Sequence, residues 1–197
     1  PVVVVLAAGR GVRFAGPGHK LAQRFQDGSV LGTTLTQVLK SGLPLVVVTT
    51  EAHVGEATKQ VAHRDVLLLT AEQAQRGMAR SIVAGVSARA DARGWLILPA
   101  DMPLIQPQTL RSVAAALPGQ ACVVPTHGGR RGHPVAFSAE LFPDLLALDG
   151  DEGARRLLMR YPVRTIEVPD PGILIDIDTH NDLQVARGHA GDADAMT

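Results

Sequence analysis

The sequence has little of several features that define common protein classes. Its 197 residues include one cysteine, so no disulfide can form within the chain and no cysteine zinc cluster exists. Aromatic residues make up 3% of the chain, and 19 basic side chains balance 19 acidic ones. Nothing in this composition indicates attraction to nucleic acid or an anionic membrane, because both need basic surfaces and nucleic acid also favours stacking side chains. We therefore expect small molecules as partners.

Long hydrophobic runs are also missing. No apolar stretch approaches the ~18 residues of a membrane-spanning helix, and residues 2–6 are too short for a secretion signal and lack its basic flank. The sequence predicts a soluble, cytoplasmic protein, with a monomer as the default. Cys122 lies in the apolar run 121–124, so we expect it to be buried and chemically inert.

Short apolar runs alternate with segments of helical periodicity along most of the chain. Strands are predicted at residues 2–6, 45–48, 66–69, 95–98, 121–124, 134–137, 163–168 and 173–177, and helices at 31–41, 53–63, 76–89, 107–117, 141–148, 153–161 and 182–187. This alternation favours an α/β fold with a mostly parallel sheet, in which ligands bind beyond the carboxyl ends of the strands. Without a repeat or a linker, we expect one domain over residues 1–188 and a frayed tail at 189–197.

A loop rich in glycine and basic residues follows the first strand. It contains Gly9, Gly11, Gly16 and Gly18 together with Arg10, Arg13, His19 and Lys20. Glycines let backbone N–H groups approach a ligand, and with Arg and Lys they suit a polyanion such as a triphosphate. The pattern matches neither the Walker loop nor the dinucleotide fingerprint. An ordinary turn with surface cations remains an equal alternative.

Carboxylates follow two other predicted strands. Asp101 comes directly after the strand 95–98, between two prolines, while Asp176 and Asp178 alternate with isoleucines and would project to one face of a strand. Such carboxylates can hold Mg²⁺ that bridges phosphate oxygens. Alternatively, Asp101 caps a turn, and Asp178 or Thr179 caps the next helix.

Two further polar segments lie near predicted strand ends. Residues 75–81 start a helix whose N-terminus favours anions, and Gly77 and Ser81 there can approach a nucleotide. Residues 128–133 place Arg131 and His133 on a loop that suits a second phosphorylated substrate. A solvent-facing helix start and a structural histidine are the alternatives.

These segments resemble motifs of the MobA-like NTP transferases, and of molybdenum cofactor cytidylyltransferases in particular. The similar stretches are LAAGRGVRF (6–14) with KL (20–21), QRGMARS (75–81), LPADMP (98–103), GGRRGHPVAF (128–137), GDEGAR (150–155) and DIDTHNDL (176–183). The sequence departs from the family pattern at Gly11, where serine is usual, in a slightly longer spacing from Arg13 to Lys20, and at residues 180–181, where the family has Pro-Glu.

The resemblance implies a Rossmann-like, mostly parallel sheet flanked by helices, of the nucleotide-diphospho-sugar transferase type. It implies catalytic roles for Arg13, Lys20 and Asp101, and Mg²⁺ or Mn²⁺ held by Asp101 and Asp178 with support from Asp176. Nucleotide binding is implied for Leu6, Ala7, Ala8, Gly9, Arg10, Gly11, Arg13, Lys20, Gly77, Ser81 and Asp101, and contact with a second substrate for Arg131, His133 and Arg155.

The reaction implied is transfer of CMP from CTP to the phosphate of a molybdopterin-type cofactor, with release of pyrophosphate and with a molybdoenzyme as possible recipient. The chain shows no nucleophile-plus-base motif, which agrees with direct attack by the substrate phosphate. A related enzyme that uses GTP, or that acts on a sugar phosphate or another small phosphate acceptor, is the alternative. A non-catalytic accessory protein that delivers the cofactor is the alternative from another class, although it would not need Arg13, Lys20, Asp101 and Asp178 together.

Overall fold

The computed structural model describes residues 1–9, 11, 14, 18–150 and 153–194, with side chains described up to residue 189. The strands are β1 Val2–Ala7, β2 Arg24–Phe25, β3 Gly28–Ser29, β4 Leu45–Thr49, β5 Val66–Leu68, β6 Gly94–Pro99, β7 Cys122–His127, β8 Arg130–Arg131, β9 Val135–Ser138 and β10 Val163–Glu167. The α-helices are α1 Val30–Ser41, α2 Glu51–Ala57, α3 Ala71–Gln75, α4 Met78–Ser87, α5 Pro107–Ala116, α6 Phe142–Leu146, α7 Arg155–Arg160 and α8 His180–Asp194. Short 3₁₀ helices are η1 Lys20–Ala22, η2 His63–Asp65, η3 Ala139–Leu141 and η4 Pro171–Leu174.

The main sheet has the strand order β10-β7-β9-β6-β1-β4-β5, with β8 added beside β7. Strand β1 lies at its centre, parallel to both β4 and β6, and Val5 of β1 is in register with Val47 and Leu98. Strand β9 runs antiparallel between β6 and β7, whereas β10 is parallel to β7. The predicted α/β fold with a mostly parallel sheet is confirmed, and β9 makes the sheet mixed.

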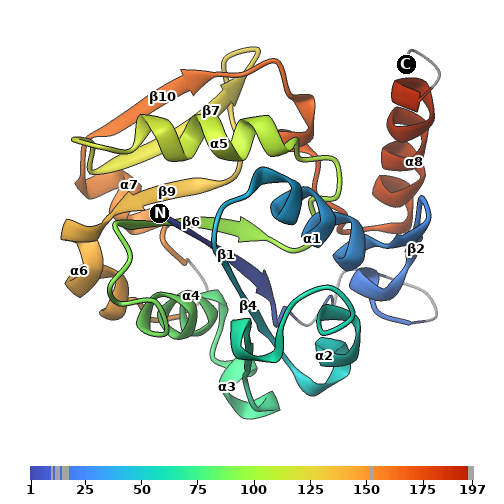
Figure 1. Ribbon diagram of the computed structural model, residues 1–197, viewed down its shortest axis with the longest axis horizontal. Helices are drawn as coiled ribbons and strands as arrows, with labels where there is room; N and C mark the ends of the chain where they lie inside the picture. The colour runs from blue at the N-terminus through green and yellow to red at the C-terminus, as the bar shows by residue number, and fades with distance from the viewer. Residues whose placement is uncertain (10, 12–13, 15–17, 151–152, 195–197) are drawn as a thin grey trace.

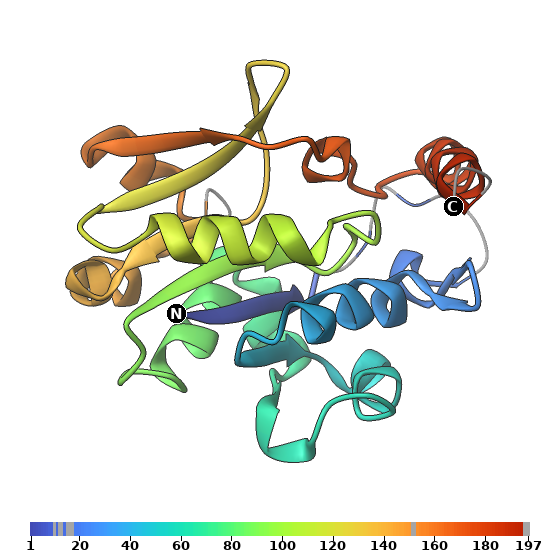
Figure 2. The same cartoon turned by 45° about the horizontal axis from the view of Figure 1, so that its top comes forward.

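Helices cover both faces of this sheet (Figures 1 and 2). Val3 and Val5 of β1 point into a core formed with α1 and α5, whereas Val2 and Val4 point into a second core formed with α4, α6 and α7. Helix α4 lies so close to the sheet that a Cβ atom on its Gly85 would come within 2.3 Å of the Val4 side chain. The unbroken apolar run of β1 is therefore explained by burial on both faces.

The strand predicted at residues 173–177 is absent. Residues 171–174 form the helix η4 instead, because Asp170 accepts the N–H of Gly172 at 2.9 Å and Pro171 favours the first turn of a helix. Asp170 also accepts the side-chain hydroxyl of Thr109 at 2.6 Å, which ties this segment to α5. The segment is instead joined to its neighbours by single backbone bonds, from the N–H of His133 to the Ile173 carbonyl and from the N–H of Ile177 to the Asp101 carbonyl.

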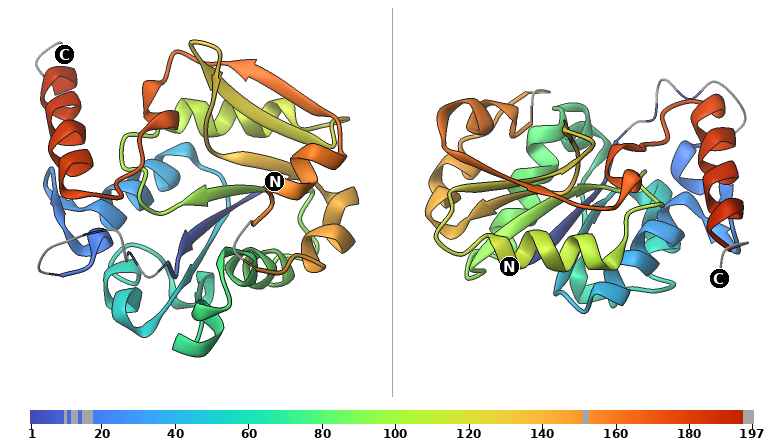
Figure 3. Two further views of the ribbon diagram at one scale, coloured as in Figure 1. Left: turned by 180° about the vertical axis from the view of Figure 1, so that it is seen from behind. Right: turned by 90° about the horizontal axis from the view of Figure 1, so that it is seen from above.

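Helix α8 differs from its prediction at both ends. It begins at His180 and continues past Gly188 to Asp194, although the sequence predicts an end at Arg187 and a frayed tail. Thr179 and Asp182 form a capping box at its start, and no proline follows to stop it. Figure 3 shows α8 beside the β2–β3 hairpin, where Arg187 donates a hydrogen bond to the backbone carbonyl of Arg24 at 2.6 Å.

Smaller differences concern the first half of the chain. Helix α2 ends at Ala57, earlier than predicted, and α3 was not predicted at all.

Cys122 is buried as expected, and burial raises the pKa of its thiol to about 11. Among the described residues, no helix combines the length and the apolar character that crossing a membrane requires. The extent of the domain, residues 1–188, stays a prediction.

Candidate active site

Three charged side chains meet where β1 and β6 end. The Lys20 ammonium donates one hydrogen bond to Oδ2 of Asp101 and another to Oδ1 of Asp178, each at 2.6 Å. All three side chains are largely buried, with 12%, 13% and 16% of their surface exposed. Charge-assisted hydrogen bonds of this length are strong when they are shielded from water. The structure thus brings together Lys20, Asp101 and Asp178, which the sequence places in three separate motifs.

Backbone hydrogen bonds hold Asp101 at the end of β6. The N–H of Ala100 donates to the carbonyl of Leu6 at 3.1 Å, which continues the pairing between β6 and β1. The N–H of Ile177 donates to the Asp101 carbonyl at 3.0 Å. This second bond brings the segment before α8 to the strand ends, and Asp178 follows one residue later.

The capping box of α8 fixes Asp178. The backbone N–H groups of Asp178 and Thr179 both donate to Oδ2 of Asp182, at 3.2 and 2.7 Å. Asp178 therefore sits immediately before the N-cap, and its carboxylate turns to Lys20 rather than to the helix. Sequence reasoning treated capping and a site role as alternatives, and the structure assigns capping to Thr179 and leaves Asp178 for the site.

The charges in this cluster shift one another's ionisation. Burial alone would lower the pKa of Lys20, but Asp101 and Asp178 outweigh burial and raise it above its ordinary value of 10.5. The pKa of Asp176 is raised by partial burial and by repulsion from Asp101 and Asp178. Lys20 thus remains a cation at neutral pH, while three carboxyl groups surround it.

His133 lies near Asp101. Its backbone N–H donates to the carbonyl of Ile173 at 3.0 Å, and Gly132 lies so close to that same oxygen that a Cβ atom there would clash with it. Burial lowers the pKa of the His133 imidazole, and the nearby Asp101 opposes that change. Of the predicted second-substrate residues, His133 therefore neighbours the carboxylates, while Arg131 in β8 and Arg155 in α7 are exposed.

The carboxylates fit a divalent metal ion. Oδ1 of Asp101 is buried and has no hydrogen-bond partner among the described atoms, and two carboxylates already share one cation, Lys20. The described part of the chain contains no cluster of three or more metal-binding side chains. Because Mg²⁺ is commonly held by one or two carboxylates plus substrate phosphates, Asp101 and Asp178 match a site that the nucleotide completes.

His19 holds the two ends of the loop after β1 together. Its Nδ1 accepts the backbone N–H of Leu21 at 3.2 Å, so its Nε2 carries the proton and donates to the carbonyl of Gly9 at 2.9 Å. Gly11 has a φ of 60°, and a Cβ atom there would approach the His19 ring within 2.9 Å. Sequence reasoning missed this role, because the partners of His19 are backbone atoms that leave no signature in residue types.

A cavity of about 660 Å³ adjoins this loop. Ala8, Gly9 and His19 line one side of it, and the residues around α3, including Gln75, line the other. Of the predicted nucleotide residues further on, Gly77 caps α4 with a φ of 95° and Ser81 is buried within α4. Arg10 and Arg13 lie outside the described residues.

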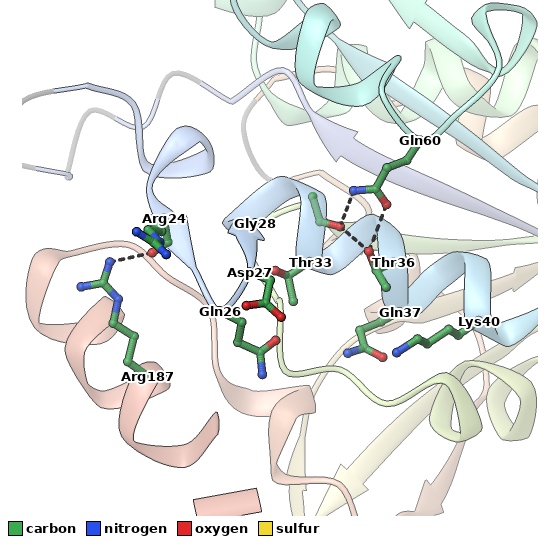
Figure 4. Close-up of a pocket in the computed structure, with 11 residues that line it drawn as sticks. Arg24, Gln26, Asp27, Gly28, Thr33, Thr36, Gln37, Lys40, Gln60 and Arg187 are labelled. Carbon is green, nitrogen blue, oxygen red and sulfur yellow. Dashed lines mark hydrogen bonds between the residues drawn. The ribbon is translucent and has the colours of Figure 1, made fainter. Parts of the chain in front are cut away.

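A larger groove of about 980 Å³ lies elsewhere, between α1, the β2–β3 hairpin and α8. Figure 4 shows its polar lining, in which the Gln60 side chain bonds the Gly32 carbonyl at 3.1 Å and the Thr36 hydroxyl at 3.0 Å. None of the described site residues that the sequence predicts lines this groove. Of those residues, Ala8 and Gly9 line the 660 Å³ cavity, and Lys20, Asp101 and Asp178 meet at the strand ends.

The mixed sheet, the loop after β1 and the carboxylates at the strand ends define a nucleotidyltransferase. Comparison with known proteins agrees with this class and identifies the family within it. The chain belongs to the family described as the MobA-like NTP transferase domain, whose model matches residues 3–165.

Individual relatives match almost the whole chain. The Purine catabolism protein PucB of Bacillus subtilis (strain 168) is 32% identical over 196 residues, covering 93% of this chain and 94% of the relative. The Molybdenum cofactor cytidylyltransferase of Escherichia coli (strain K12) is 22% identical over 188 residues, with the same coverage of 93% and 94%. Rv0371c of Mycobacterium tuberculosis H37Rv superimposes with a TM-score of 0.80 at 29% identity, covering 95% of this chain and 96% of that one, and a crystal structure of it in complex with manganese matches at 0.78.

Proposed function

We propose that this nucleotidyltransferase transfers CMP from CTP to the phosphate of a molybdopterin-type cofactor and releases pyrophosphate, with Mg²⁺ or Mn²⁺. The observation that carries the proposal is the position of Lys20 between Asp101 and Asp178, at the strand ends and directly after the loop held by His19. This arrangement supplies a cation for phosphate and two hard oxygen ligands for a metal in one place.

Each group has a role in the proposed reaction. The loop 6–11 with Arg10 and Arg13 binds the triphosphate, and Lys20 neutralises charge that grows on it as the bond to pyrophosphate breaks. Asp101 and Asp178 hold the metal ion, which would supply electrostatic stabilisation of the phosphates. The nucleotide base lies in the 660 Å³ cavity, which Ala8, Gly9 and Gln75 line. Gly77 and Ser81 follow Gln75 along the chain, at the start of α4.

The acceptor phosphate attacks the α-phosphorus of the nucleotide in line, and no group of the protein forms a covalent bond to it. We assign the acceptor to the side of His133, Arg131 and Arg155, since His133 adjoins Asp101. The backbone N–H of His133 donates to the carbonyl of Ile173, and this bond fixes the position of His133. The acceptor would therefore contact a histidine that is already held in place.

CTP is favoured over GTP by the similarity to the E. coli relative, which is named a cytidylyltransferase, at 22% identity. A guanylyltransferase, or a transferase acting on a sugar phosphate or another small acceptor, would have the same carboxylates and loop. A non-catalytic accessory protein is disfavoured because it has no need of a lysine held between two carboxylates. A recipient molybdoenzyme, a monomeric state and a cytoplasmic location remain predictions.

The test is thermal unfolding with CTP, GTP, ATP or UTP, each with and without Mg²⁺. A ligand that binds only the folded state raises Tm by mass action, so the four nucleotides can be ranked. A Mg²⁺-dependent rise with CTP alone supports the proposal, and a preference for GTP refutes the cytidylyl assignment. Pyrophosphate release with CTP and the pterin acceptor then separates the enzyme from the accessory protein, which would bind without release.

A further inference from the structure

Lys20 occupies the position between two carboxylates where a shared divalent cation would be held. We propose that Lys20 competes with the metal for this position, so that the protein binds the metal tightly only together with the nucleoside triphosphate. This inference rests on the metal site of the proposed function and concerns the regulation of that site.

Both cations need the same pair of carboxylates. The Lys20 ammonium is 2.6 Å from Oδ2 of Asp101 and 2.6 Å from Oδ1 of Asp178. A metal ion shared by these carboxylates would lie about 2 to 2.5 Å from an oxygen of each, and Oδ1 of Asp101 has no hydrogen-bond partner among the described atoms. An ammonium and a divalent ion on the same two carboxylates repel each other strongly, since the surroundings are largely shielded from water. Lys20 therefore weakens metal binding for as long as it stays between the carboxylates.

Leaving is costly for Lys20 unless it finds another anion. Its two hydrogen bonds are charge-assisted and lie in a part-buried site. A bound triphosphate next to the loop 6–11 offers phosphate oxygens as replacement partners for Lys20. The nucleotide therefore removes most of the cost of freeing the carboxylates.

Such an exchange couples the two ligands. If the nucleotide raises the affinity for the metal by a given factor, the metal raises the affinity for the nucleotide by the same factor. The protein without nucleotide would then hold divalent ions weakly, although its carboxylates are already placed.

The charge balance around Lys20 predicts what its removal does. Lys20 donates a hydrogen bond to Asp101 and another to Asp178. An uncharged side chain at residue 20 takes that positive charge away from both carboxylates. Replacing Lys20 with an uncharged residue should therefore strengthen metal binding in the absence of nucleotide, the opposite of what a purely structural lysine would do.

The experiment measures Mn²⁺ affinity of the nucleotide-free protein by electron paramagnetic resonance and calorimetry at pH 8. We expect Lys20→Met to bind Mn²⁺ at least about tenfold more tightly than the wild type, because the competing charge is gone. Lys20→Arg keeps the charge and should stay near the wild-type affinity, as should Lys40→Met, which removes an exposed lysine outside the site. Adding Asp101→Asn to Lys20→Met should abolish the gain.

Several results would overturn the competition. Circular dichroism of Lys20→Met, compared with that of the wild type, checks that the variant is folded, and Lys20→Gln serves as a second uncharged variant. Mn²⁺ affinity in a folded uncharged variant that equals or falls below that of the wild type refutes the proposal. A wild type whose Mn²⁺ affinity is the same with and without CTP, while CTP itself binds, also refutes it.

The outcome is separable from that of the proposed function. If no nucleotide binds to the wild type but nucleotide-free Lys20→Met still gains Mn²⁺ affinity, the CTP assignment fails and the competition stands. If the wild type releases pyrophosphate from CTP while Lys20→Met gains nothing, the function stands and the competition fails.

Discussion

The imidazole rings of His19 and His53 lie against each other, with their centroids 4.1 Å apart. His53 comes from α2 and is buried, whereas His19 joins Gly9 to Leu21 across the loop after β1. The hydrogen bond from Leu21 to Nδ1 requires the neutral form of His19, since an imidazolium ion has no lone pair there. His19 thus links the loop after β1 to α2 as well as joining the two ends of the loop.

Removing the His19 ring should weaken nucleotide binding more than it slows the chemical step. In His19→Ala the Gly9 and Leu21 ends of the loop lose their common partner. Ordering the loop then costs free energy when the nucleotide binds. We expect KM for the nucleotide to rise about tenfold with kcat changed less than about threefold, the pattern of lost uniform binding. Steady-state kinetics of pyrophosphate release measures both. His19→Gln, whose amide can donate to Gly9, should recover part of the KM change, and an unchanged KM in His19→Ala would contradict the role.

Acid should destabilise the protein through His53. Burial lowers the pKa of His53 to about 4 from an ordinary 6.5. In the unfolded chain His53 therefore binds a proton as the pH falls below 6.5, whereas in the folded protein it binds that proton only near pH 4. Stability from this source is complete above pH 6.5 and falls as the pH drops through that window, by up to about 2 kcal/mol at pH 4.5.

Urea unfolding between pH 7 and 4.5 checks this dependence. In His53→Gln the group that titrates is gone, so the decline with acid should be shallower than in the wild type. His63→Gln removes an exposed histidine of η2 and should leave the slope unchanged. Equal slopes in all three proteins would show that His53 does not titrate as its burial implies.

The carboxylate of Asp101 should be essential for turnover and dispensable for folding. Asp101→Asn keeps the shape of the side chain, but it removes the negative charge that faces Lys20. It also removes one of the two carboxylates that are proposed to hold the metal. We expect kcat to fall by about 10³-fold or more, since the proposed reaction depends on electrostatic stabilisation at this position. Tm should change by only a few degrees, because the backbone bonds of residue 101 remain. Asp91→Asn, at an exposed position, is the matched control, and wild-type activity in Asp101→Asn would remove Asp101 from the site.

Much of the arrangement follows from local sequence, and the failures have physical causes. The run of valines forms β1, and Gly42 in a left-handed conformation ends α1; both effects act between neighbours in the chain, and both the strand at 2–6 and the helix end at 41 were predicted. The strand predicted around Ile175 was wrong because Asp170 bonds to groups of α5 more than sixty residues earlier. Lys20 and the carboxylates were predicted as separate motifs, whereas the ion pairs between them required the folded sheet.

Substitutions at Gly188 test whether α8 extends past its predicted end. Residue 188 lies inside α8, and a Cβ atom there would meet no atom within 4 Å. Gly188→Ala should therefore stabilise the protein by about 0.5 to 1 kcal/mol, since alanine favours the helix and loses less backbone freedom than glycine. Gly188→Pro should instead destabilise the helix beyond residue 184 and lower its content in circular dichroism. If residues 188–194 are frayed in solution, neither substitution changes the free energy of unfolding measured in urea, and the predicted end at Arg187 would be restored.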